Sequence, residues 1–413
     1  MSGLGSDLDD RGDERSLTLQ DARVVTPDAV VEGGLRVAGD RIEAVGPDLQ
    51  AGTSESASDP KGRGSATGGP ADRVVDVGGR LVVPGLVDLH GDSIEDHLFP
   101  RDGVRMRTPV AMETADRENV AAGVTTKFHA ISFMNSATRN RSPELGREIA
   151  AAIDDGPDGD SPSLAADHRL HARCELTESD AVETVEELVE AGAVDLVSVM
   201  THIPGEGQFR NYDGFDDWYD GRDLPREQAR ERYERKTSTT AAAIERGAER
   251  VIEFARAAGV PVATHDDVDR ETLERRQDLG ADIAEYPVTL DAAETAVGLE
   301  MTTAMGAPNL VQGGSQRGNL RTADAIDAGV VDVLCADYHP PSLLLAPFIE
   351  TGEPLPERIR RVTAGPADAV GLTDRGRIEP GKRADLAVVE PDPVPRVTRV
   401  FVGGREVYRH GER

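Results

Sequence analysis

From about Leu86 onward, short apolar segments alternate with amphipathic helical segments along the chain. Such alternation is typical of parallel strands joined by crossover helices. Eight apolar segments predict an α/β fold in the form of a (β/α)8 TIM-like barrel, with one mouth formed by the strand ends. The expected strands are GLVDLH, VTTKFHAI, RLHARCEL, VDLVSVMTH, VPVATHD, ADIAEYPVT, TAMGAPNL and VDVLCADYH.

Alternating β-pattern also stands at both ends of the chain, outside the barrel repeat. We expect these flanks, residues 16–83 and 373–413, to pair into a small β-sandwich beside a barrel spanning 84–372. Residues 1–15 have no apolar pattern and are expected to be a disordered leader. Residues 51–72, rich in Gly, Ser and Ala, are expected to be a solvated loop within the β domain.

The charge balance limits which partners the protein can have. With 76 acidic and 46 basic residues the net charge is −30, which argues against nucleic acid because phosphate binding needs a basic surface. An acidic surface of this kind is typical of proteins adapted to concentrated salt. The alternative is an acidic protein of ordinary cytosol. No segment is suited to a signal peptide or a membrane span, and two cysteines are too few for a disulfide framework. We therefore expect a cytoplasmic homo-oligomer that binds neither nucleic acid nor membrane.

Imidazole and carboxylate groups recur at the carboxyl ends of the expected strands. They are His90 with Asp92, Glu175, His202, His265 and Asp337. Barrel enzymes place their active sites at these ends, and burying such groups without a shared partner is costly. A divalent cation supplies that partner, and imidazole with carboxylate ligands suits Zn²⁺, with Mn²⁺ or Fe²⁺ as alternatives. For any single histidine, a hydrogen-bonded structural role remains the alternative.

Several longer motifs carry a resemblance to a known family. They are PGLVDLHGDSIEDHLFPRDGV, HARCEL, THIPG, THDD, MGAPNLVQGGSQRGN, ADYHP and RGRIEPGKRADLAVV. Together, from about Leu81 to Gly404, they resemble the amidohydrolases of phosphonate utilisation. The resemblance implies a diphosphatase that converts α-D-ribose 1-methylphosphonate 5-triphosphate to the 5-phosphate and pyrophosphate.

The resemblance also implies roles for the strand-end residues. The metal ligands would be His90, Asp92, Glu175, His202, His265 and Asp337, holding two divalent ions. Glu175 would bridge the two ions where many amidohydrolases use a carboxylated lysine, with Lys127 as a weaker rival for that place. Asp337 would also accept the proton of the attacking water. His202 and His265 fall on the fourth and fifth expected strands, whereas amidohydrolases usually carry these ligands on the fifth and sixth. Either one strand is miscounted or the barrel is distorted.

A triphosphate substrate requires local positive charge in this acidic chain. Arginine binds phosphate oxygens in a bidentate way, and a glycine-rich loop lets backbone N–H groups approach an anion. The expected substrate-binding residues are Arg101, Arg105, Arg173, Arg210, Gly313, Gly314, Ser315, Arg317 and His339. Each arginine could instead form a surface ion pair. Residues 205–225, rich in aromatics, are expected to be either a lid over the substrate or a loop packed on the rim.

Two other functions remain open on the sequence. An amide hydrolase or deacetylase could use the same metals on another substrate and would need fewer phosphate-binding arginines. A barrel without catalysis could serve as a binding subunit, and it would lack the two equivalents of metal per chain expected of the enzyme.

Overall fold

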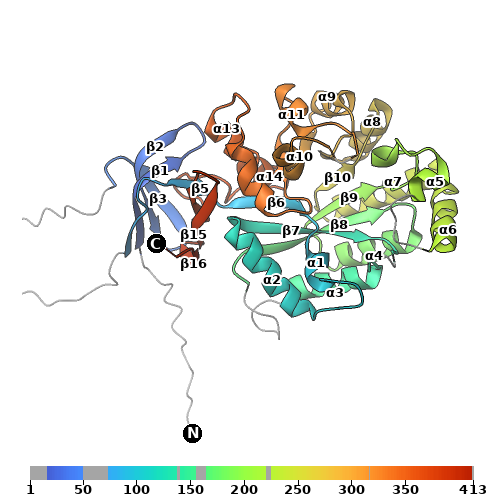
Figure 1. The fold of residues 1–413 in the computed structure, drawn as a ribbon, viewed down its shortest axis with the longest axis horizontal. Helices are drawn as coiled ribbons and strands as arrows, with labels where there is room; N and C mark the ends of the chain where they lie inside the picture. Colours follow the sequence, from blue (N-terminus) through green and yellow to red (C-terminus); the bar gives the residue numbers. More distant parts are fainter. Residues whose placement is uncertain are drawn as a thin grey trace, which may run out of the picture.

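A parallel barrel and an adjoining β-sheet make up the computed structural model (Figure 1). It describes residues 16–49, 73–136, 140–154, 164–219, 225–315 and 317–411. The predictions of a leader at 1–15 and a loop at 51–72 concern segments outside these residues.

The barrel consists of eight parallel strands that follow one another in chain order. They are β6 (Leu86–Gly91), β7 (Val124–Phe133), β8 (Asp167–Glu175), β9 (Leu196–Met200), β10 (Val262–His265), β11 (Ile283–Glu285), β12 (Thr302–Gly306) and β13 (Val333–Cys335). Each expected apolar segment overlaps one of these strands, so the barrel prediction is confirmed. Small and branched side chains fill the interior, among them Ala263, Ile283, Ala304 and Val333.

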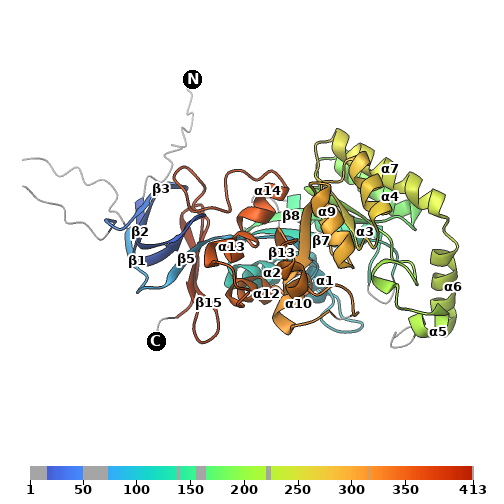
Figure 2. The ribbon, with the colours of Figure 1, turned by 90° about the horizontal axis from the view of Figure 1, so that it is seen from above.

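Helices surround the barrel (Figure 2). They are α1 (Ile94–Leu98), α2 (Thr108–Ala121), α3 (Pro143–Asp154), α4 (Ser179–Glu190), α5 (Gly214–Tyr219), α6 (Arg226–Thr237), α7 (Ala241–Ala257), α8 (Arg270–Leu279), α9 (Leu290–Gly298), α10 (Ala307–Gln312), α11 (Thr322–Asp327), α12 (Pro341–Leu345), α13 (Leu355–Arg360) and α14 (Ala364–Ala369), with short 3₁₀ turns at Gly207–Phe209 and Ala346–Phe348. Of these helices, α6 lies at the barrel mouth. Side chains of Thr240, Asp269 and Thr289 cap α7, α8 and α9 by accepting N–H bonds. Among the described helices, none has the length and apolar content needed to cross a membrane.

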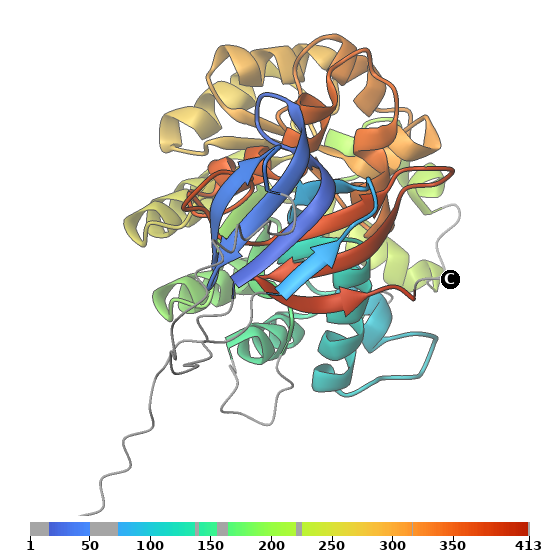
Figure 3. The same cartoon turned by 90° about the vertical axis from the view of Figure 1, so that its left-hand side faces the viewer.

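The two flanks of the chain form one sheet next to the barrel, as predicted (Figure 3). Its strands are β1 (Ser16–Val25), β2 (Val30–Ala38), β3 (Arg41–Gly46), β4 (Arg73–Asp76), β5 (Leu81–Pro84), β14 (Leu386–Glu390), β15 (Arg396–Val402) and β16 (Arg405–Arg409). Strand β5 pairs with β1 on one side and with β14 on the other, which joins the N- and C-terminal flanks. Because β5 leads into β6 within two residues, this sheet anchors the first barrel strand.

Candidate metal centre

The six predicted ligands gather at the carboxyl end of the barrel, around a cavity of about 450 Å³. Five of them line this cavity: His90, Asp92, His202, His265 and Asp337. Glu175 is fully buried and contacts His202. His202 follows the fourth barrel strand and His265 ends the fifth, so no strand was miscounted.

Backbone hydrogen bonds close the barrel at this centre. The N–H of Asp337 donates to the carbonyl of His90 over 2.7 Å, and the N–H of Asp92 donates to the carbonyl of Asp337 over 3.0 Å. Asp337 has a φ of 53°, in the left-handed region, and Asp266 and Tyr286 have φ values of 62° and 53° after their own strands. Such conformations cost energy and cluster at functional sites.

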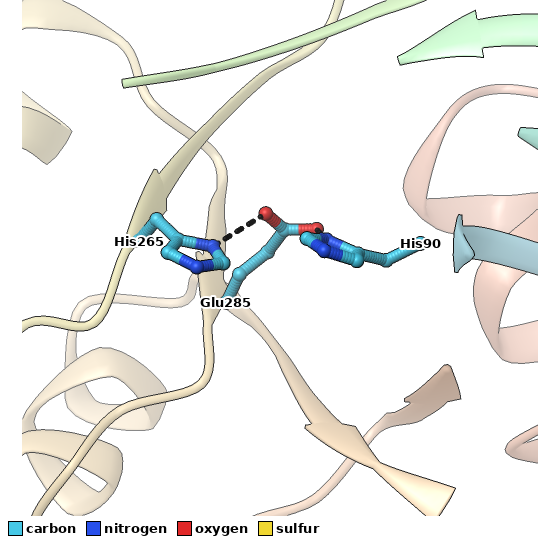
Figure 4. Close-up of side chains that lie close together, drawn as sticks. All are labelled: His90, His265 and Glu285. Atoms are coloured by element: carbon cyan, nitrogen blue, oxygen red, sulfur yellow. Dashed lines mark hydrogen bonds and ion pairs between the residues drawn. The ribbon is translucent and has the colours of Figure 1, made fainter. Parts of the chain in front are cut away.

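A single carboxylate holds two of the histidines. Glu285, the last residue of β11, lies 3.1 Å from Nδ1 of His90 through one oxygen and 3.1 Å from Nδ1 of His265 through the other (Figure 4). The two imidazole rings stack with centroids 5.4 Å apart. A carboxylate in this position fixes ring orientation and tautomer, and one atom from each of the three side chains lies within 4.8 Å of the others. The sequence analysis missed Glu285 because the expected strand ADIAEYPVT runs on to Thr289 and so places Glu285 in its middle, whereas β11 ends at Glu285.

Glu175 forms a second buried network with His202 and Lys236. One carboxylate oxygen lies 2.6 Å from Nδ1 of His202, and the other lies 2.9 Å from Nζ of Lys236. Burial opposes ionisation of Glu175, but His202 and Lys236 outweigh it and lower its pKa. Lys236 belongs to α6, which is far in sequence from the end of any strand, and it was not predicted. Its amine holds Glu175 as a carboxylate that a cation can bind.

Lys127 belongs to a different pair. Its Nζ lies 2.6 Å from Asp88, both side chains are fully buried, and Lys127 does not line the cavity. Asp88 in turn accepts N–H bonds from His90 and Ala336, so this pair braces the backbone behind the site. A Cβ on Gly91 would lie 1.6 Å from the Lys127 amine, which explains the glycine there. Glu175 does not line the cavity either, but it contacts His202, which does, whereas Lys127 is bonded to Asp88; this contact favours Glu175 over Lys127 for a bridging place.

The protonation states at this centre suit a cation. Burial lowers the pKa of His90, and it lowers that of His265 to about 3, so both rings are neutral and keep a lone pair for a metal. Burial and the neighbouring Asp92 raise the pKa of Asp337 to about 7, and burial raises that of Asp266 to about 7. Burial and mutual repulsion make the ionised forms of neighbouring carboxyl groups unfavourable, and a cation bound between them stabilises those ionised forms. The residues therefore fit divalent metal binding.

The predicted substrate-binding residues divide into two groups. Arg173, Ser315 and Arg317 line the cavity. Arg210 donates to the carbonyl of Val288, a lining residue. Arg210 itself does not line the cavity, and neither do Arg101, Arg105, Gly313, Gly314 and His339. Arg105 is exposed and pairs with Glu148, because the chain after β6 runs outward into α1 and α2, and His339 is exposed with its Nδ1 near Ser342.

Three cationic side chains that the sequence did not indicate also line the cavity. Arg141 follows β7, and Arg232 and Lys236 lie on α6. With Arg173 and Arg317 they make five cations around three lining carboxylates, those of Asp92, Asp266 and Asp337. Cationic side chains therefore outnumber carboxylates in the lining, and two of the five, Arg141 and Lys236, pair with Glu95 and Glu175 behind it.

The segment predicted to be a lid or a packed loop packs against α6. The structure describes residues 205–219 and 225 of this segment. Phe215, Trp218 and Ala229 are buried together, with Tyr219 and Tyr233 packed against them. Trp218 and Phe209 also line the cavity. The segment thus packs over the mouth, and closure on substrate stays a prediction.

A parallel eight-stranded barrel with imidazoles and carboxylates gathered at its mouth defines an amidohydrolase-type hydrolase. The model of the amidohydrolase family matches residues 346–413. Among solved structures, N-acetylglucosamine-6-phosphate deacetylase from Pasteurella multocida is 15% identical with a TM-score of 0.58, covering 95% of this chain and 99% of that one. Beta-aspartyl dipeptidase from Fervidobacterium islandicum is 14% identical with a TM-score of 0.58, covering 95% and 97%. Both likenesses concern the fold.

A curated relative is more similar in sequence. The alpha-D-ribose 1-methylphosphonate 5-triphosphate diphosphatase of Escherichia coli K12 is 34% identical over 338 residues, which cover 80% of this chain and 89% of that protein. The chain belongs to the same family as this diphosphatase, within the amidohydrolases. The resemblance seen in the motifs is confirmed.

Proposed function

We propose that this protein hydrolyses α-D-ribose 1-methylphosphonate 5-triphosphate to the 5-phosphate and pyrophosphate. The observation that supports it most is the group of five cations around the cavity in a chain of net charge −30. Positive charge is concentrated where a triphosphate would bind, and an amide substrate has no comparable need for it. The relative from Escherichia coli carries this activity in its name.

The metal ligands in this proposal are His90, Asp92, Glu175, His202, His265 and Asp337, with Glu285 orienting two of the imidazoles. The metal proposed is zinc, with manganese or iron as alternatives, because the donors are nitrogen and oxygen without thiolate. A pair of divalent ions, when bound, lowers the pKa of water and offsets phosphoryl charge.

The residues of the chain have defined tasks in the reaction. Asp337, on the barrel rim, accepts a proton from the attacking water, whose oxygen forms a bond to the α-phosphorus. The bond from that phosphorus to the bridging oxygen of the β-phosphate breaks, and pyrophosphate leaves. Arg173 lies 3.4 Å from Asp92 and projects among the ligands, where its guanidinium can bind a phosphoryl oxygen. Trp218 and Phe209 line the cavity and limit its water.

Phosphorus NMR of the ribosyl triphosphate mixed with metal-supplemented protein in high salt tests this function. We expect signals of the 5-phosphate and of pyrophosphate to appear, and the methylphosphonate signal to persist. An amide hydrolase would instead leave the triphosphate intact and cleave an N-acetylated sugar phosphate. A folded protein that binds no metal and turns over neither compound would be a non-catalytic barrel.

A further inference from the structure

Resting on the proposed function, we infer that the two anionic ends of the substrate bind on opposite sides of the barrel mouth. The leaving pyrophosphate binds on a first wall, defined by Arg141, Arg232 and Lys236. The methylphosphonate end binds on a second wall, defined by Arg317 and Gln208. The reacting phosphorus then lies between these walls, over the metal ligands.

The first wall lies over the ends of β7 and β8. Arg232 and Lys236 are one helical turn apart on α6, which places both on one face. Arg232 donates to the Ser136 hydroxyl just after β7, and Lys236 donates to the Thr177 hydroxyl just after β8. Helix α6 follows β9 in the chain, yet these bonds hold it over the two preceding strands.

The cations of the first wall are held in fixed positions. Arg141 contacts Glu95 at 2.6 Å and donates to the Ser132 hydroxyl, while Lys236 contacts Glu175 at 2.9 Å. Both side chains are buried, and both line the cavity. Anchoring of this kind lowers the entropy lost when an anion binds.

The second wall belongs to the other half of the barrel. Arg317 follows β12 and α10, and its Nε donates to Gln208, which follows β9. Its guanidinium also stacks on the Phe209 ring, 4.8 Å from the centroid. Gln208 in turn donates to Asp266 at the end of β10. Because the strands follow one another around the barrel, the ends of β11 and β12 lie across the mouth from those of β7 and β8, and Gln208 extends this wall from the end of β9, the neighbour of β8.

The number of cations decides which end of the substrate binds where. Pyrophosphate carries more negative charge than a methylphosphonate ester and offers more acceptor oxygens, so it requires several donors. Three cationic side chains form the first wall, two of which share their charge with Glu95 and Glu175, whereas a single cation, supported by the Gln208 amide, forms the second. The lower charge of the methylphosphonate end matches the second wall.

Arg232→Gln and Arg317→Gln test this assignment in the metal-loaded full-length protein, with Arg235→Gln as control. Arg235 is exposed on α6 and does not line the cavity. Loss of one charge-assisted contact weakens binding by roughly 10- to 100-fold. We expect R232Q to raise the inhibition constant of added pyrophosphate by that factor, while R317Q and R235Q leave it nearly unchanged.

A truncated substrate tests the second wall. We expect R317Q to lower kcat/KM for the methylphosphonate-bearing triphosphate by roughly 10- to 100-fold, yet to leave kcat/KM for ribose 5-triphosphate nearly unchanged, because the latter lacks the group that Arg317 binds. Equal effects of R232Q and R317Q on both measurements, or the reverse pattern, would overturn the assignment.

The failure of the proposed function has a different signature. If the wild-type protein releases no pyrophosphate from either compound, the reaction is wrong, and calorimetric titration with pyrophosphate and with methylphosphonate still tests the two walls. Selective loss of pyrophosphate binding in R232Q, with methylphosphonate binding lost only in R317Q, supports them. Absence of binding, or binding insensitive to both variants, refutes them.

Discussion

Asp337 and His90 are joined by a backbone hydrogen bond of 2.7 Å, in which the N–H of Asp337 donates to the carbonyl of His90. This bond links the last barrel strand to the first at the point where their side chains enter the cavity. The barrel therefore closes through two residues of the candidate site. A substitution at either position tests the role of its side chain only if the backbone conformation is preserved.

Asp337→Asn meets this condition, because asparagine tolerates the left-handed conformation that Asp337 adopts. We expect the melting temperature to stay close to that of the wild type. Loss of the proton acceptor should lower kcat for pyrophosphate release by about 10²- to 10⁴-fold. Full activity in a folded D337N protein would exclude the assigned role.

Glu285→Gln should weaken metal binding, because a glutamine has one oxygen and cannot accept from both His90 and His265 as Glu285 can. Loss of such an orienting group typically costs about 10- to 100-fold in affinity. Competition with a chelator, followed by metal analysis of the protein, measures this. Glu294→Gln, an exposed change on α9, is the matched control. Equal metal retention in E285Q and the control contradicts the role of Glu285.

Lys127→Met should destabilise the fold, since it leaves Asp88 as a buried carboxylate without its cation. Breaking a buried ion pair in this way costs about 3–5 kcal/mol. Urea unfolding measures the loss, and Lys382→Met, which removes a surface bond to the Thr373 carbonyl, serves as control. Unchanged stability together with lost metal would instead mean that Lys127 is a ligand.

The lowered pKa of Glu406, in the flanking sheet, predicts that the free energy of unfolding depends on pH. Burial opposes its ionisation, but hydrogen bonds from Arg409, Arg73 and Arg399 outweigh burial and hold its pKa at about 2. A depressed folded pKa contributes stability above the unfolded value of about 4.3, and this contribution is lost as pH falls from there toward 2.

Glu406→Gln should therefore cost roughly 1 kcal/mol at neutral pH, after allowance for solvent screening, and progressively less below about pH 4. Urea unfolding at several pH values measures the difference. Glu32→Gln, exposed on β2, provides the comparison. A cost of E406Q that grows on acidification would show that the arginine contacts are not responsible.

Salt should stabilise this protein strongly. The net charge of −30 produces self-repulsion, and at 1 M salt the screening length is about 3 Å, so most of the repulsion between surface charges is removed. We expect the melting temperature to rise between low and molar KCl. A melting temperature that is highest at low salt would refute salt adaptation.

The sequence by itself determined the barrel, the pairing of its flanks and the place where chemistry-bearing side chains meet. Each strand is a short local pattern, and the residue at its carboxyl end must reach the mouth whatever the remaining packing. His90, His265 and Asp337 could be placed on this basis. Glu285 could not, because the expected segment ADIAEYPVT continues four residues beyond the point where β11 ends.

Only the tertiary structure decided which cations surround the cavity. Arg101 follows the first strand in sequence yet lies outside the lining, while Arg232 and Lys236 reach the mouth from a helix that crosses back over earlier strands. No local period encodes that path, because it depends on long-range bonds to Ser136, Thr177 and Glu175. Strand ends are fixed by the geometry of the barrel, whereas loops and the helices they carry are positioned by contacts between residues far apart in the chain.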